Sequence, residues 1–134
     1  MSNKDSSDET STAGNDGRPR RLETAAALED FRSEAGVALV EFVTEGCGIC
    51  ASMEPVLTNL AREADVRIGV INPRNDPPLI ETFEVKSVPL FVLFVDGKPI
   101  ARKAEGFVSG DDLSAWITEH VTEHAGDGAT HGST

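Results

Sequence analysis

Residues 37–50 read VALVEFVTEGCGIC, and they carry most of what the sequence says about fold and chemistry. The first seven are apolar except for Glu41 and β-branched at both ends, which is typical of a strand buried on both faces of a sheet. The run ends at Val43, and a long helical pattern begins after Gly46. Cys47 and Cys50 therefore lie where a buried strand gives way to a helix.

The two cysteines are spaced for a disulfide that opens and closes easily. In the first turn of a helix, Cα atoms three residues apart lie ~5–5.5 Å from each other, within the ~4.4–6.8 Å that a disulfide accepts. Unpaired N–H groups at a helix N-terminus also stabilise a thiolate. We expect Cys47 to be the nucleophile, and the more buried Cys50 to be the thiol that resolves a mixed disulfide.

Two other interpretations of the pair stay open. The thiols could be buried and inert, or they could supply half of a zinc site. A zinc site needs four ligands, and the remaining candidates lie at the far C-terminal end of the chain: His120, His124 and His131. For a redox couple we expect no cofactor and no metal, because the dithiol itself carries the two electrons.

Composition excludes several classes of protein. The chain has 134 residues, and no apolar run approaches the ~20 residues of a membrane span. Its net charge of −11, from 23 acidic and 12 basic residues, argues against a nucleic-acid partner. Two cysteines are too few for a disulfide-stapled secreted scaffold, and the N-terminus has no apolar signal region. We expect a monomeric, cytoplasmic protein.

The folded unit is predicted to be a single domain. Segments 1–21 and 125–134 are polar and have no helix or strand period, so we expect both to be disordered tails. The domain then spans residues 22–124, a common size.

Within that domain, helical and strand patterns alternate. The helical patterns cover residues 22–34, 47–64, 76–83 and the segment from Ser109 onward, and the strand patterns cover 37–43, 66–71, 90–95 and 99–106. Strands separated by helices pair in parallel, whereas the turn at Asp96 and Gly97 predicts an antiparallel hairpin. The expected fold is α/β, with a mixed central sheet and helices on both faces. Pro55 lies inside the second helical pattern and is expected to kink it.

These motifs resemble the thioredoxin family over residues 22–124. The resemblance rests on an acid in the buried strand, the CxxC motif, a following proline, a Ser-Val-Pro segment, a hairpin turn and a late glycine: Glu41, Cys47–Cys50, Pro55, residues 87–89, Asp96–Gly97 and Gly106. It implies a thioredoxin-like three-layer sandwich in which the Val88–Pro89 peptide bond is cis and faces the active-site disulfide. The alternative is a trans proline that only begins a strand.

The resemblance also implies a substrate groove around the disulfide. An extended substrate segment would pair with the backbone there, and the residues expected to bind it are Gly48, Ile49, Val88, Pro89 and Gly106. The sequence departs from the family at Gly46, where Trp is usual, and at Ile49, where Pro is usual.

Glu41 is a candidate proton carrier. An ionised carboxylate is costly to bury among Val, Leu and Phe, so its pKa should rise. The resemblance implies that this acid assists proton transfer at Cys50. In the alternative interpretation Glu41 reaches the surface or pairs with a cation.

Together these observations predict a thioredoxin-type protein-disulfide reductase. Its partners would be disulfide-containing proteins and a reductase that regenerates the dithiol. A disulfide oxidase or isomerase, and a non-catalytic peptide-binding module, are the alternatives. Acidic residues are spread over the whole domain, which suits a salt-rich cytoplasm because salt screens their repulsion; an acidic face for a basic partner is the other interpretation.

Overall fold

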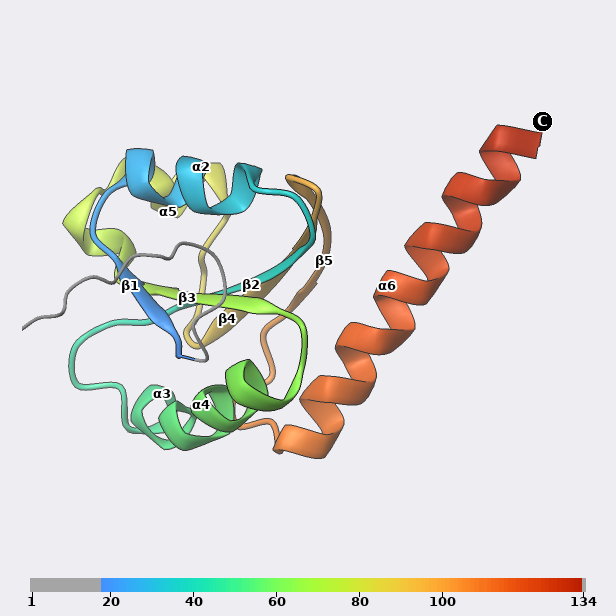
Figure 1. Cartoon of the computed structure of the whole chain (residues 1–134). Coiled ribbons are helices and arrows are strands. Elements are labelled where there is room, and N and C mark those ends of the chain that lie inside the picture. The colour runs from blue at the N-terminus through green and yellow to red at the C-terminus, as the bar shows by residue number, and fades with distance from the viewer. Residues whose placement is uncertain (1–17, 134) are drawn as a thin grey trace, which may run out of the picture.

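A mixed five-stranded sheet with helices on both faces forms the centre of the protein (Figure 1). The structure is a computed structural model that describes the backbone of residues 18–133 and the side chains of residues 18–125. The strand order is β1-β3-β2-β4-β5, for the strands β1 (Arg20–Leu22), β2 (Val37–Phe42), β3 (Arg67–Ile71), β4 (Leu90–Val95) and β5 (Lys98–Lys103). The predicted three-layer α/β architecture is confirmed.

Strand directions also follow the prediction. Both β1 and β2 run parallel to β3, whereas β4 is antiparallel to β2 and to β5. The carboxyl ends of β1, β2 and β3 therefore share one end of the sheet with the start of β4. Asp96 and Gly97 both have positive φ, 51° and 87°, as the tight turn of the β4–β5 hairpin requires.

The helices form the two outer layers. One face carries α2 (Ala25–Ser33) and α5 (Pro78–Thr82), with the short 3-10 helix η1 (Pro73–Asn75) leading into α5. The other face carries α3 (Gly48–Ser52), α4 (Glu54–Glu63) and α6 (Gly110–Ser133).

Strand alternation distributes the side chains of β2 between the two layers. Val40 and Phe42 pack into the core under α2 and α5. Leu39 packs into the core under α4 and α6, and Glu41 has the same parity and lies on that side. This alternation places the one glutamate of β2 below α3 and α4.

The N-terminal boundary differs from the prediction. Leu22 was expected to begin a helix, and residues 18–21 to belong to a disordered tail. Instead Arg20–Leu22 form β1, which pairs with β3, and the first helix begins at Ala25 after Thr24 caps its N-terminus. A three-residue edge strand is held by backbone hydrogen bonds to its neighbour and is too short to show a side-chain period. Residues 1–17 lie outside the described part of the chain.

The long helical pattern after Gly46 is two helices. Pro55 was expected to kink one continuous helix, but α3 ends and α4 begins at Met53, so that Pro55 falls in the first turn of α4. A proline is well accommodated there because the N–H groups of the first turn have no carbonyl acceptor within the helix, so the missing N–H of proline costs no hydrogen bond.

The last helix is longer than predicted. The domain was expected to end at residue 124, but the backbone of α6 continues to Ser133 and extends away from the sheet in Figure 1. Within the described residues, no helix combines the length and apolarity that a membrane span needs.

Candidate active site

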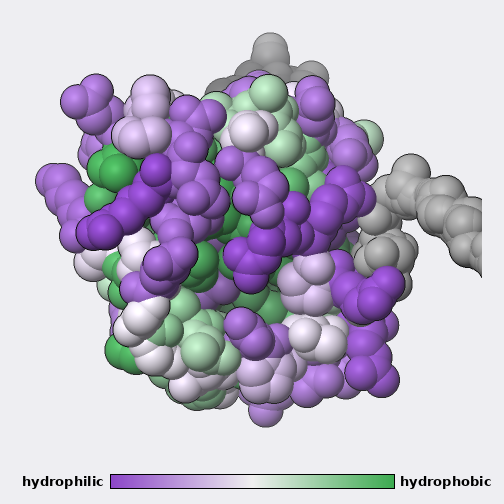
Figure 2. Space-filling view, turned by 90° about the vertical axis from the view of Figure 1, so that its left-hand side faces the viewer, coloured by the Kyte–Doolittle hydropathy of each residue, from purple (hydrophilic) through white to green (hydrophobic). Residues whose placement is uncertain are grey.

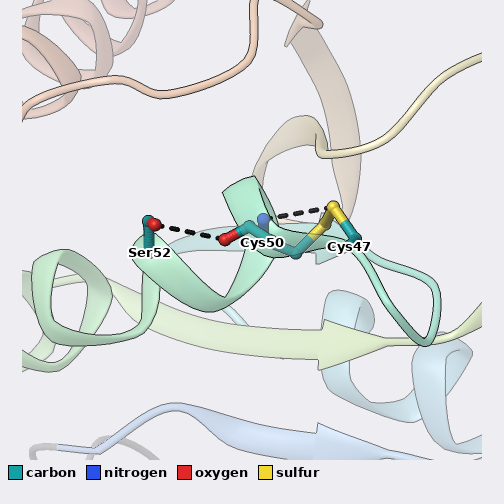
Figure 3. The surroundings of a disulfide bond; sticks show 4 residues. Cys47, Cys50 and Ser52 are labelled. Carbon is teal, nitrogen blue, oxygen red and sulfur yellow. Dashed lines mark hydrogen bonds between the residues drawn. A yellow bond between two sulfur atoms is a disulfide. The ribbon is translucent and has the colours of Figure 1, made fainter.

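Cys47 and Cys50 form a disulfide at the N-terminal end of α3, with Cα atoms 5.2 Å apart. Cys47 is the N-cap residue of the helix, and its Sγ accepts a hydrogen bond of 3.1 Å from the backbone N–H of Cys50 (Figure 3). The structure therefore confirms a disulfide-bonded pair with an N–H donor directed at the first sulfur. Cys50 is buried, with 6% of its surface exposed, whereas Cys47 is half-buried.

Local sequence explains why the disulfide lies there. The turn at Glu45 and Gly46 separates β2 from α3, and Gly46 has a φ of 78°, which glycine adopts without strain. Ser52 Oγ donates a hydrogen bond of 3.1 Å to the carbonyl oxygen of Gly48 across the short helix (Figure 3). The cysteines are thus held on one compact turn directly after the buried strand.

Glu41 is buried beneath this turn. Only 1% of its surface is exposed, and its Oε2 has no hydrogen-bond partner. Burial raises the pKa of Glu41 to about 8, and the negative charge of Glu54 contributes to the rise. The alternative in which Glu41 reaches the surface is wrong, whereas the expected direction of the pKa shift is found.

A cavity of about 850 Å³ connects these groups. Glu41, Cys47 and Cys50 all line it, so the structure brings the three predicted catalytic residues to one space. Sequence reasoning missed other residues that line it, among them Glu54 of α4 and three arginines at the start of the described chain, Arg18, Arg20 and Arg21. No pattern in the sequence signalled Glu54, because it begins α4, a helix separate from the α3 of Cys50.

The expected substrate-binding residues form two groups. Ile49 lies beside Gly106, because its Cδ1 is 3.9 Å from the position that a Cβ on Gly106 would occupy. Ile49 and Phe107 are exposed apolar side chains, 46% and 55% accessible. Gly48 is exposed and opens α3.

Val88 and Pro89 precede β4 on the other side of β2. Their peptide bond is cis, as the family resemblance implies. Leu90 pairs with Phe42, so Pro89 lies at the end of the sheet where β2 leaves toward Cys47. The described lining of the cavity does not include Val88 or Pro89.

The surface around this end of the sheet is mainly polar. Figure 2 views the side on which β2 leads into α3, and hydrophilic side chains cover most of it, with smaller hydrophobic areas between them. In the described part of the chain, no three His, Cys, Asp or Glu side chains gather as a metal ion would require.

Comparison with known proteins agrees with the disulfide at the strand–helix junction. The model of the thioredoxin family matches residues 22–119, most of the chain. This chain belongs to the thioredoxin family. Thioredoxin from Chlamydia pneumoniae is 39% identical over 100 residues, which cover 72% of this chain and 93% of that protein. Thioredoxin from Chlamydia caviae is 37% identical over 97 residues, 70% of this chain and 94% of the relative.

Solved thioredoxin structures share the fold. A mutant thioredoxin from Halobacterium salinarum superposes with a TM-score of 0.74 at 29% identity, covering 81% of this chain and 95% of that chain. Thioredoxin from Fasciola hepatica gives a TM-score of 0.67 at 29% identity, over 75% of this chain and 98% of the other. With its cysteines paired at a strand–helix junction, the chain is a thiol–disulfide oxidoreductase of the thioredoxin type. Thioredoxins reduce disulfides in proteins by thiol–disulfide exchange and are themselves reduced by a reductase.

Proposed function

We propose that this thioredoxin reduces protein disulfides with Cys47 as nucleophile, Cys50 as resolving thiol and Glu41 as proton carrier. The observation that supports these roles best is the shared cavity, which is lined by both sulfur-bearing residues and by the buried carboxyl group. The difference in exposure between the cysteines supports the assignment of Cys47, because an incoming disulfide must reach the attacking sulfur.

The exchange has two steps. The Cys47 thiolate attacks a substrate disulfide, forming a Cys47–substrate bond as the substrate S–S bond breaks and one substrate thiolate leaves. Cys50 then gives its proton to the ionised form of Glu41, which is the minor form at pH 7 because its pKa is about 8, and attacks the Cys47 sulfur. This attack closes the Cys47–Cys50 disulfide and releases the second substrate thiolate. The substrate gains two electrons, which the dithiol supplies.

Around this chemistry, Gly48, Ile49, Val88, Pro89 and Gly106 would hold the substrate. The contact between Ile49 and Gly106 and the exposure of Ile49 support an apolar docking surface next to the disulfide. The start of β4 at the same end of the sheet supports backbone pairing between Val88 and an extended substrate segment.

Composition supports a proposal about the physiological setting. We place the protein in the cytoplasm as an electron carrier between a donor reductase and protein disulfides, active as a monomer. Its net charge of −11 with acids spread along the domain supports adaptation to high salt.

Insulin reduction with dithiothreitol as electron source tests the mechanism. Cys47→Ser should abolish turnover. Pre-reduced Cys50→Ser, mixed with insulin after dithiothreitol has been removed, should accumulate a covalent enzyme–insulin adduct that dithiothreitol added later releases. An unchanged rate in Cys47→Ser would eliminate the proposed roles. Measuring the reduction potential separates the alternatives, because a value near −270 mV is typical of a thioredoxin reductant and one near about −180 mV of an isomerase.

A further inference from the structure

In the proposed mechanism Glu41 must give up a proton, and the residues paired with it in the sheet cannot accept one. Its neighbours across the sheet are Val70 on β3 and Phe91 on β4, neither of which carries a titratable group. With 1% of its surface exposed and Oε2 without a partner, the carboxyl group can pass its proton only into the cavity that it lines.

Glu54 is the carboxylate across that cavity. It lies in the first turn of α4, four residues after Cys50, and it is exposed while also lining the cavity. It is close enough to Glu41 for its negative charge to raise the pKa of Glu41. One side chain thus reaches both the space around the buried acid and bulk solvent.

The other charged groups that line the cavity are less suited to this transfer. They are Arg18, Arg20 and Arg21 beside β3, and Glu45 in the loop before Cys47. Arginine stays protonated throughout the working pH range and therefore cannot relay a proton. Glu45 precedes α3 and does not contribute to the raised pKa of Glu41, whereas Glu54 does.

We propose that Glu54 is a positioning residue that takes the proton from Glu41 across the cavity and releases it to solvent. This inference deepens the proposed function and rests on Glu41 accepting the Cys50 proton. In the resolving step the proton moves from Cys50 to Glu41, then to the Glu54 carboxylate, and then to water. During reduction by the donor the same proton moves inward, from solvent through Glu54 and Glu41 to the Cys50 thiolate.

A reaction with 5,5′-dithiobis(2-nitrobenzoate) separates the relevant step. The reduced protein releases one thionitrobenzoate when Cys47 attacks the reagent and a second when Cys50 resolves the mixed disulfide. We expect Glu54→Gln to leave the first release unchanged and to slow the second by about ten-fold at pH 7 in dilute buffer, less than the ~100-fold or more lost with a direct general base. Imidazole at high concentration should restore the rate, and Glu54→Asp should keep most of it.

The direction in which Glu54→Gln changes the rate of the second release distinguishes a proton relay from an effect of the Glu54 charge alone. Removing the Glu54 charge favours the ionised form of Glu41, whose pKa is about 8, so an effect of charge alone would speed the second release at pH 7. A second release as fast as in the wild-type protein, a faster one, or a slow one that imidazole does not restore would each overturn the proposal.

Two variants separate this inference from the proposed function. Glu63→Gln, at the opposite end of α4 and outside the cavity, should behave as the wild-type protein. If Glu41→Gln leaves the second release unchanged, the role of Glu41 fails and the inference fails with it. If Glu41→Gln slows it and Glu54→Gln does not, only the role of Glu54 fails.

Discussion

The backbone N–H of Cys50 donates a hydrogen bond to Sγ of Cys47 at 3.1 Å, while Cys50 itself is only 6% exposed. The accessible sulfur thus receives the stabilising donor, and the buried sulfur lies one helical turn behind it. The proposed difference in reactivity between the two sulfurs can be measured directly.

We expect limiting iodoacetamide at pH 7 to modify Cys47 of the reduced protein at least ~10 times faster than Cys50, because a thiolate must be both formed and accessible to react. Peptide mapping by mass spectrometry gives the two rates. The protein unfolded in urea is the control, in which the rates should become similar. Equal rates in the folded protein, or no reaction at either thiol, would contradict the assignment and favour a binding module without redox activity.

Glu41 should make the oxidised protein less stable as pH rises. Its pKa is about 8 in the folded protein, whereas the ordinary pKa of a glutamate is 4.5, so between these values the folded state holds a proton that the unfolded state has lost. The contribution of this proton to the free energy of unfolding is therefore fully present below pH 4.5. It falls by ~1.4 kcal/mol per pH unit up to about pH 8 and stays constant above that pH. The total loss is on the order of 5 kcal/mol.

Urea unfolding of the oxidised protein from pH 5 to 9 measures this dependence. Relative to wild type, Glu41→Gln should remove the downward slope, while the exposed control Glu63→Gln should keep it. The same slope in wild type and Glu41→Gln would show that Glu41 titrates with an ordinary pKa in the folded protein.

Arg67 should be the most important buried charge for stability. Arg67 is 7% exposed. Its guanidinium donates hydrogen bonds to the carbonyl oxygens of Phe31, Glu34 and Ala35, which lie at the end of α2 and in the turn to β2. Arg67→Ala would leave these acceptors unpaired and should lower the free energy of unfolding by about 3 kcal/mol.

Urea denaturation at pH 7 tests the effect of Arg67. Arg67→Lys should recover little of the loss, because one ammonium group cannot reach all three carbonyl groups. Arg62→Ala on the exposed side of α4 is the matched control and should change stability by less than ~0.5 kcal/mol. A loss of similar size in both alanine variants would rule out the role of the buried hydrogen bonds.

Ile49 should affect protein substrates more than small ones. It is 46% exposed beside Gly106 and next to the disulfide, so a docked protein would cover it. Ile49→Ser should raise the KM for insulin by about five-fold, equivalent to ~1 kcal/mol of lost apolar burial. The rate with 5,5′-dithiobis(2-nitrobenzoate), which needs no such surface, is the control and should stay within about two-fold. Equal losses with both substrates would point to altered cysteine chemistry instead of docking.

Salt should stabilise the protein if its acidity is an adaptation to salt. We expect the Tm to rise by about 5 °C or more between 0.05 M and 2 M KCl, since screening removes repulsion within a chain of net charge −11. A variant with four exposed glutamates replaced by glutamine, Glu29, Glu63, Glu81 and Glu123, should show a smaller rise. A Tm that does not respond to KCl would defeat the adaptation and favour an acidic surface for a basic partner.

Local patterns were enough to predict most of the fold and the centre of the site. The buried strand, the Cys47–Cys50 spacing and the hairpin turn at Asp96–Gly97 depend on residues close together in the chain, and all three appear as expected. The cis bond before Pro89 followed from the family resemblance alone. Element ends were less predictable, because β1 exists only through its pairing with β3, and α4 begins where Pro55 fits a first turn.

By itself, the sequence determined that two thiols meet at a strand–helix junction and that one carboxyl group lies in an apolar strand, because spacing and period along the chain are local quantities. Only the tertiary structure decided which groups share the cavity with Glu41, namely Glu54 from another element and the arginines of and before β1. It also left Phe107 exposed and buried Arg67 against three carbonyl groups. Burial and charge proximity arise from how distant segments pack, and no pattern within one segment encodes them.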